Sequence, residues 1–188
     1  LWALETACRQ LQQWALDERT RHLQIAVNVS PRQFRQSDFV LQVQRALQSS
    51  GVNPALLKLE LTESLVLEDV EDTIDKMQQI KLLGVRFAMD DFGTGYSSLA
   101  YLAQLPLDQL KIDRSFVRNI PGKRNDGTIV RTIITMSQGL EMEVIAEGVE
   151  TEAQRRFLQT HGCHAYQGYL FSPPLPLPLE ALERMLLE

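Results

Sequence analysis

The residues best suited to chemistry lie in the stretch Asp90–Leu99, which reads Asp-Asp-Phe-Gly-Thr-Gly-Tyr-Ser-Ser-Leu. The segment before it, 84–89, begins with glycine and is mostly apolar, which predicts a strand that ends at the two acids. Two adjacent carboxylates at the end of a buried strand are unfavourable unless a cation or donor neutralises them. A metal ion is the simplest such partner, and paired aspartates can serve two ions. A strand-end turn with a helix cap at Ser97 or Ser98 would explain the serines but not the acids.

Polar residues also end the other predicted strands. These residues, one at or near the carboxyl end of each strand, are Asn28, Glu60, Asp90, Lys111, Glu147 and Gln167. The asparagine and the acids are hard oxygen ligands, which favours Mg²⁺ or Mn²⁺ over zinc. With Asp90 as a bridge, two ions about 3.5–4 Å apart would clamp a phosphodiester and activate a water. Lys111 would position that water or stabilise charge on the phosphate, and Glu147 would hold the second ion or accept a proton.

Each of these residues also has a purely structural interpretation. Lys111 could pair only with Asp113 at a strand end, Glu147 could cap the next helix, and Asn28 could be a turn residue. The shared position of the set at strand ends favours a common site over these separate roles.

Strands and helices are predicted to alternate along the chain. Short apolar runs predict strands at 24–30, 56–63, 85–89, 107–113, 142–147 and 163–168. Helical spacing and capping residues predict helices at 1–19, 37–49, 68–82, 98–104, 127–139, 151–160 and 179–187. This alternation predicts an α/β fold with a parallel sheet and helical crossovers.

The polar strand ends decide between two parallel architectures. A barrel brings the carboxyl ends of all its strands to one face, whereas a doubly wound sheet gathers only the few beside its switch point. Six polar strand ends therefore favour a TIM-like (β/α)8 barrel. Six strands are too few to close it, so we expect the first two strands to precede Leu1, with residues 1–188 forming one partial domain.

The composition is that of an ordinary globular domain. Hydrophobic residues make up 44% and charged residues 23% of the chain, and the net charge of −5 argues against binding to a nucleic-acid backbone. Cys8 and Cys163 are far apart and form no redox or zinc motif. No apolar run reaches the roughly 20 residues that a membrane helix requires. We expect a cytoplasmic domain without membrane contact, whose parent protein can be tethered to a membrane.

The motifs together resemble the EAL domain family of cyclic-di-GMP-specific phosphodiesterases. They are Val27–Ser30, Glu60–Ser64, Asp90–Leu99, Leu110–Asp113, Ala146–Thr151 and Gln167–Tyr169, in the order of the family. The resemblance implies a (β/α)8 barrel that hydrolyses cyclic-di-GMP to linear pGpG with two Mg²⁺ or Mn²⁺ ions. It further implies a homodimer with sensory or signalling domains on its amino-terminal side.

The resemblance also implies a role for each matching residue. Asn28, Glu60 and Asp90 would hold the first metal, Asp90 and Asp91 the second with help from Glu147, Lys111 would orient the attacking water, and Gln167 would steady water and substrate. Glu63 would anchor the glycine-rich loop, and Asp113 and Glu150, which match motif positions, would contact substrate.

The chain departs from the family at one motif. The Glu-Ala-Leu motif, whose glutamate is a metal ligand, is absent and is expected upstream of Leu1 together with a substrate-binding arginine. The chain on its own is therefore expected to have low activity or none. The rival interpretation is a catalytically inactive EAL-type receptor, which binds cyclic-di-GMP and signals through a protein partner.

Overall fold

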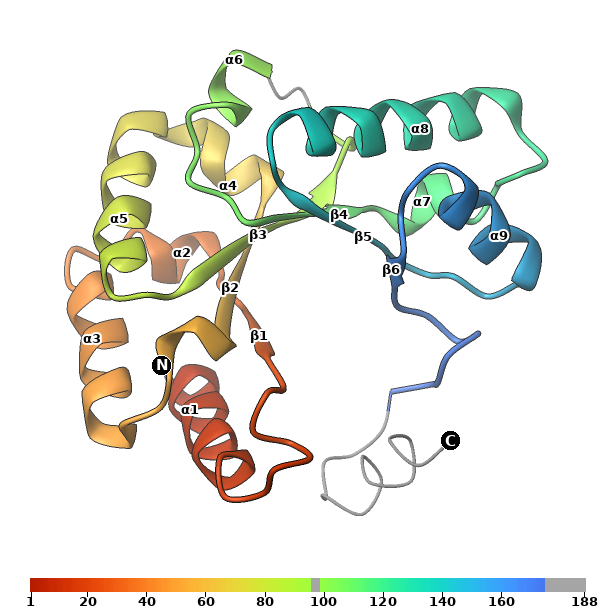
Figure 1. Cartoon of the computed structure of the whole chain (residues 1–188). Helices are drawn as coiled ribbons and strands as arrows, with labels where there is room; N and C mark the ends of the chain where they lie inside the picture. Colours follow the sequence, from red (N-terminus) through yellow and green to blue (C-terminus); the bar gives the residue numbers. More distant parts are fainter. Residues whose placement is uncertain (96–98, 175–188) are drawn as a thin grey trace.

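The computed structural model describes residues 1–95 and 99–174 and contains one six-stranded parallel sheet. The strands follow one another across the sheet in sequence order, as expected for successive strand–helix units. Their bounds are β1 Ile25–Asn28, β2 Leu57–Thr62, β3 Arg86–Phe92, β4 Gln109–Ile112, β5 Glu143–Ala146 and β6 Ala165–Tyr166. The sheet curls into an open arch, a half-barrel, with the helices outside it (Figure 1). The predicted α/β, TIM-like architecture is confirmed.

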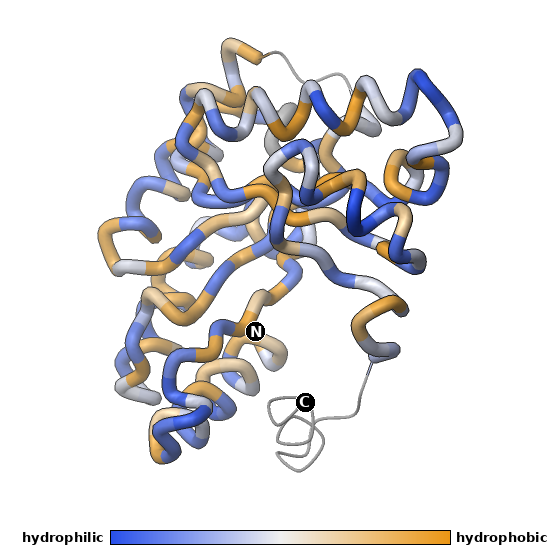
Figure 2. Tube along the Cα trace, turned by 45° about the vertical axis from the view of Figure 1, so that its right-hand side comes forward, coloured by the Kyte–Doolittle hydropathy of each residue, from blue (hydrophilic) through white to orange (hydrophobic). Residues whose placement is uncertain are grey.

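The helices lie on the outer side of the arch, where α1 precedes β1 and the others connect successive strands. They are α1 Trp2–Trp14, α2 Pro31–Phe34, α3 Phe39–Ser50, α4 Glu63–Glu68, α5 Val70–Leu82, α6 Leu99–Leu102, α7 Arg114–Val117, α8 Arg124–Gly139 and α9 Glu152–Thr160, with a 3-10 turn at Pro54–Leu56. In Figure 2, α8 alternates between hydrophilic and hydrophobic segments along its length. Its buried face includes Val130, Ile133 and Ile134, and residues such as Arg131 are exposed. This amphipathic pattern fixes which face of the helix packs on the sheet.

Side-chain alternation on the strands separates the core from the inside of the arch. On β3, Phe87 and Met89 are buried in the apolar layer beneath the helices. Successive side chains on a strand point to opposite faces, so Ala88 and Asp90 face the inside of the arch. The apolar layer holds the sheet and helices together, and the inner face is left for polar side chains.

Three short helices were not predicted, because each is too short to show an apolar repeat, and two of them begin at a side-chain cap. Ser30 caps α2 by accepting a hydrogen bond from the Gln33 N–H, so Pro31 opens a helix directly after the strand predicted at 24–30. Asp113 caps α7 in the same way. The third, α4, follows β2 directly.

The longer helices and the strands are confirmed with shifted ends. α8 begins at Arg124, before the predicted start at 127, so Gly127 lies within the helix, where it is buried against Phe157. α3, predicted over 37–49, ends before Gly51, and Asp38 occupies its cap position without a side-chain hydrogen bond.

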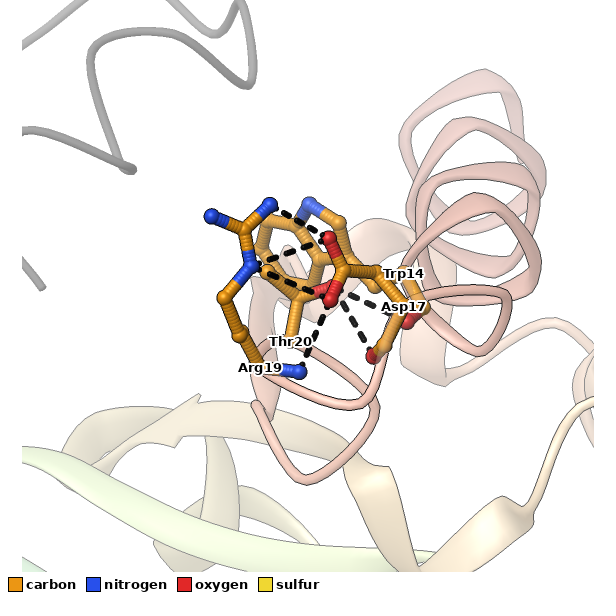
Figure 3. Close-up of polar contacts among 4 residues, drawn as sticks. All are labelled: Trp14, Asp17, Arg19 and Thr20. Carbon is orange, nitrogen blue, oxygen red and sulfur yellow. Dashed lines mark hydrogen bonds and ion pairs between the residues drawn. The ribbon is translucent and has the colours of Figure 1, made fainter.

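The predicted helix over 1–19 is wrong at its end, since α1 stops at Trp14 (Figure 3). The Thr20 hydroxyl donates a hydrogen bond of 2.9 Å to the Trp14 carbonyl oxygen, and Asp17 accepts one from the Arg19 backbone N–H. Asp17 also forms an ion pair of 2.7 Å with the Arg19 guanidinium. These local bonds compete with helical ones and turn the chain toward β1.

Some predictions fall outside the described residues: the cap at Ser97 or Ser98 and the helix at 179–187. Within residues 1–95 and 99–174, no helix combines the length and apolar character needed to span a bilayer.

Candidate functional site

The inner face of the arch carries a buried cluster built around the Lys111 ammonium. Its Nζ lies 2.7 Å from Glu147 Oε1, 2.9 Å from Glu60 Oε2 and 3.0 Å from Asp90 Oδ1. The Lys111 side chain is only 6% exposed. Residues from β2, β3, β4 and the segment after β5 thus meet at one point, as the strand-end prediction required. The alternative that Lys111 pairs only with Asp113 is wrong.

Strand register explains how these residues meet. Asn28 pairs with Glu60 across β1 and β2, and Thr62 pairs with Asp90 across β2 and β3. The Glu147 N–H donates to the Ile112 carbonyl oxygen, which continues the β4–β5 pairing by one residue. Asn28 is exposed at the end of β1. Its predicted metal-binding role stays a prediction.

A β-bulge brings Asp91 to the same side as Asp90. In a regular strand two consecutive side chains point to opposite faces. The β3–β4 register shifts between Met89 and Phe92, and Asp91 has a positive φ of 54°. Carboxylate oxygens of Asp90, Asp91 and Glu147 consequently lie within 4.8 Å of one another. Sequence reasoning named both aspartates but ended the strand at residue 89, so it missed the bulge that joins them.

The electrostatics of the cluster favour a bound cation. Burial, followed by the nearby carboxylates of Asp90 and Asp113, raises the pKa of Asp91. Burial also raises the pKa of Glu147, against the opposing effect of Lys111. Although burial alone would lower it, hydrogen bonds to carboxylates raise the pKa of Lys111 above its usual range. One ammonium faces more acids than it can neutralise, and the donors are oxygens only, so the site fits Mg²⁺ or Mn²⁺.

The remaining predicted site residues differ in position. Gln167, just after β6, donates from Nε2 to Glu147 Oε1 at 2.6 Å and so joins the cluster. Asp113 caps α7 and acts electrostatically on Asp91. Glu150 is exposed, and its backbone N–H donates to Gln154. The substrate-binding roles of Asp113 and Glu150 stay predictions.

The alternative role of Glu147 as a helix cap is wrong. The cap of α9 is Thr151, whose side chain accepts from the Gln154 N–H while the Gln154 side chain accepts from the Thr151 N–H. This capping box satisfies the start of the helix by itself. Glu147 takes no part in this cap, and its carboxylate pairs with Lys111 instead.

Glu63 contacts the glycine-rich loop, and its predicted anchoring role stays a prediction. Its Oε2 accepts hydrogen bonds of 3.1 Å from the backbone N–H groups of Gly93 and of Gly95. The Glu63 side chain belongs to α4 and is buried. A single carboxylate therefore ties the segment after Asp91 to the end of β2.

Substitution of Glu63 by glutamine is expected to weaken Mn²⁺ binding by about tenfold, because an amide oxygen accepts more weakly than a carboxylate and holds the loop beside Asp91 less firmly. Calorimetric titration with Mn²⁺ would measure the loss. Glu71→Gln, at an exposed position on α5, is the matched control and should behave as wild type. Equal Mn²⁺ affinity of the Glu63→Gln and Glu71→Gln proteins would contradict an anchoring role.

Gly168 follows Gln167 and lies where its backbone approaches the backbone of Val149 too closely for a side chain. An added Cβ would overlap the Val149 carbonyl oxygen and the Val149 nitrogen, and φ is +152°. Both backbone groups are in use, since the Val149 N–H donates to Gln167 and the Val149 carbonyl accepts from Leu170. The close approach leaves no space for a side chain.

Gly168→Ala is expected to destabilise the fold by about 3 kcal/mol and to lower the Tm by roughly 6–12 °C, because the two backbones must separate. Thermal unfolding by circular dichroism measures the change. Gly139→Ala is the control, since nothing lies within 4 Å of its added Cβ at the end of α8. Equal melting of the two variants would contradict the close approach.

A model of the EAL domain family matches residues 1–174. The chain belongs to the EAL domain family. Cyclic di-GMP phosphodiesterase NbdA of Pseudomonas aeruginosa is 45% identical to it over 98% of this chain and 23% of NbdA. MucR of the same organism, a bifunctional diguanylate cyclase/cyclic di-GMP phosphodiesterase, is 42% identical over 93% of this chain and 25% of MucR. The EAL chain thus spans about a quarter of the length of these relatives.

Solved structures agree with this EAL assignment. The PaMucR phosphodiesterase in complex with c-di-GMP superimposes with a TM-score of 0.90 at 42% identity, covering 96% of this chain and 72% of that one. Klebsiella pneumoniae BlrP1, in a complex with manganese and cyclic-di-GMP, gives a TM-score of 0.79 at 30% identity over 92% of this chain and 44% of BlrP1. Both neighbours are complexes with the cyclic dinucleotide, and the BlrP1 structure also holds manganese.

Proposed function

We propose that this EAL domain hydrolyses cyclic-di-GMP to linear pGpG with two divalent ions, Mg²⁺ or Mn²⁺. The observation that carries the proposal is the convergence of Asp90, Asp91 and Glu147 oxygens within 4.8 Å, beside the Lys111 ammonium. Support comes from relatives named as cyclic di-GMP phosphodiesterases and from a neighbour that binds manganese with cyclic-di-GMP.

The ligand roles are those that the resemblance to the EAL family implies, and the positions of the residues support them. Asn28, Glu60 and Asp90, on three adjacent strands, would hold one ion, and Asp90 with Asp91 would hold the other, assisted by Glu147. When bound, the ions would neutralise the phosphodiester and lower the pKa of a coordinated water. The oxygen donors suit such hard cations.

The remaining residues orient the reacting groups. Lys111, fixed by three carboxylates, would direct its ammonium at the attacking water and at charge that develops on the phosphate. Gln167 holds Glu147 through its amide and would in turn steady water and substrate. The Glu63 contacts to Gly93 and Gly95 would keep the loop after Asp91 in position for catalysis.

We also propose that the domain acts in the cytoplasm as a homodimer with companion signalling domains. The relatives support companion domains, because they extend well beyond the aligned region. Size-exclusion chromatography with light scattering would test the dimer.

Product analysis tests the function directly. The full-length protein is incubated with cyclic-di-GMP and Mg²⁺, and nucleotides are separated by chromatography, with an EDTA control. Accumulation of pGpG that stops on chelation is expected. Tight binding of cyclic-di-GMP without product would reject hydrolysis and support the receptor interpretation.

A further inference from the structure

The turn at Gly93 is held by two sets of contacts. Glu63 accepts hydrogen bonds from the backbone of the loop. Phe116 and Ile133 form an apolar wall against the turn. A Cβ added at Gly93 would lie 3.0 Å from Phe116 Cε2 and 3.5 Å from Ile133 Cδ1, which shows how closely the ring and the isoleucine approach the turn. The carboxylate and this wall together form a clamp on the loop.

Phe116 is fixed to the strand that carries Lys111. It lies on α7, which follows β4 directly, and its backbone N–H donates to the Asp113 carbonyl oxygen at 3.1 Å. The Asp113 side chain caps the same turn by accepting from the Ser115 N–H at 2.9 Å. The partly buried ring packs against the core. The end of β4 therefore positions both the Lys111 ammonium and the Phe116 ring of the wall.

The clamp acts on a strained aspartate two residues before Gly93. Asp91 has a φ of 54°, a conformation that is unfavourable for a non-glycine residue and persists only where its surroundings impose it. The Asp91 carbonyl oxygen accepts hydrogen bonds from the Thr94 N–H at 3.3 Å and from the Thr94 hydroxyl at 2.8 Å. Residues 91–94 form one closed turn, so holding Gly93 also holds Asp91.

We propose that Phe116, supported by Ile133, is a positioning residue that keeps the Asp91 carboxylate in its metal-binding orientation through the Gly93 turn. The proposal deepens the proposed function, since it rests on Asp91 acting as a metal ligand. Phe116 is not among the proposed metal or substrate ligands. Its contribution is to fill the space beside Gly93, so that the loop stays where its N–H groups reach Glu63.

Phe116→Ala is the test variant, Phe116→Leu the conservative one, and Phe157→Ala the matched control. Phe157 is also partly buried and packs on a glycine, with 3.2 Å between its Cζ and a Cβ added at Gly127, but it lies on α9. Both alanine variants remove an aromatic ring from a similar setting. Only Phe116→Ala removes the wall behind Gly93.

The first readout is hydrogen exchange of the peptide 90–95 in metal-free protein, followed by mass spectrometry. Phe116→Ala should speed exchange in this peptide, Phe116→Leu should largely restore it, and Phe157→Ala should leave it unchanged. Because this experiment needs no metal and no substrate, its outcome is independent of the proposed reaction. Unchanged exchange in Phe116→Ala would overturn the positioning role.

The second readout is the Mn²⁺ dependence of cyclic-di-GMP hydrolysis in the full-length protein. Phe116→Ala should raise the half-saturating Mn²⁺ concentration by about tenfold, as expected for residues that support a metal ligand. Turnover at saturating Mn²⁺ should stay close to wild type. An equal increase in Phe157→Ala would overturn the proposal. Failure of the wild type to hydrolyse, with faster exchange in Phe116→Ala, would reject the proposed function and leave the positioning role supported.

Discussion

Replacement of Asp90 by asparagine is expected to lower cyclic-di-GMP hydrolysis by roughly 10³-fold or more, because it removes a charge from the centre of the site. Asp90 Oδ1 lies 3.0 Å from the Lys111 ammonium and accepts a hydrogen bond of 3.0 Å from the Asp91 N–H. It is also the only proposed ligand shared between the two ions. An asparagine keeps one oxygen and the shape of the side chain, so the fold should persist while metal binding fails.

Chromatography of the nucleotide products and calorimetry with Mn²⁺ would measure the two effects of Asp90→Asn separately. Asp75→Asn, at an exposed position on α5, makes the same chemical change away from the site and should retain activity. Undiminished pGpG formation by Asp90→Asn would rule out a bridging carboxylate. Circular dichroism would verify that both variants are folded.

Lys111→Met is expected to reduce turnover by about 10³-fold, through the loss of a positive charge aimed at the reacting phosphate. It also leaves three carboxylates around a buried space without their ammonium. Breaking a buried ion pair by removing one partner typically costs about 3–5 kcal/mol. The Tm of the variant should therefore fall in EDTA and rise again with Mn²⁺, since a divalent cation can replace the missing charge.

Two further lysine variants separate stability from chemistry. Lys58→Met removes another buried inward-facing lysine, whose Nζ donates to Gln109 Oε1 at 3.1 Å, and it should lose stability but keep hydrolysis. Lys111→Arg keeps the charge and should recover much of the Tm but little of the turnover, because a planar guanidinium cannot take the place of an ammonium. Full activity of Lys111→Met would contradict its assigned role.

Local patterns were sufficient to predict the strand–helix order and most of the cluster. Apolar runs and helical spacing depend on neighbouring residues, so the six strands were found with small errors at their ends. Because the carboxyl ends of parallel strands share one edge, Glu60, Asp90 and Lys111 could be grouped before any distance was known. The shared edge also explains why Glu60 and Asp90 both contact the Lys111 ammonium.

The tertiary structure decided what depends on contacts between distant segments. Lys111 and Glu60 are 51 residues apart, and their ion pair exists only because the curled sheet turns both inward. The bulge at Asp91 and the wall at Phe116 likewise have no local sequence pattern, since each is set by the strand or helix packed beside it. The sequence by itself therefore determined which residues are available at the strand ends. Only the tertiary structure decided which side chains meet, because orientation and distance arise from packing between segments.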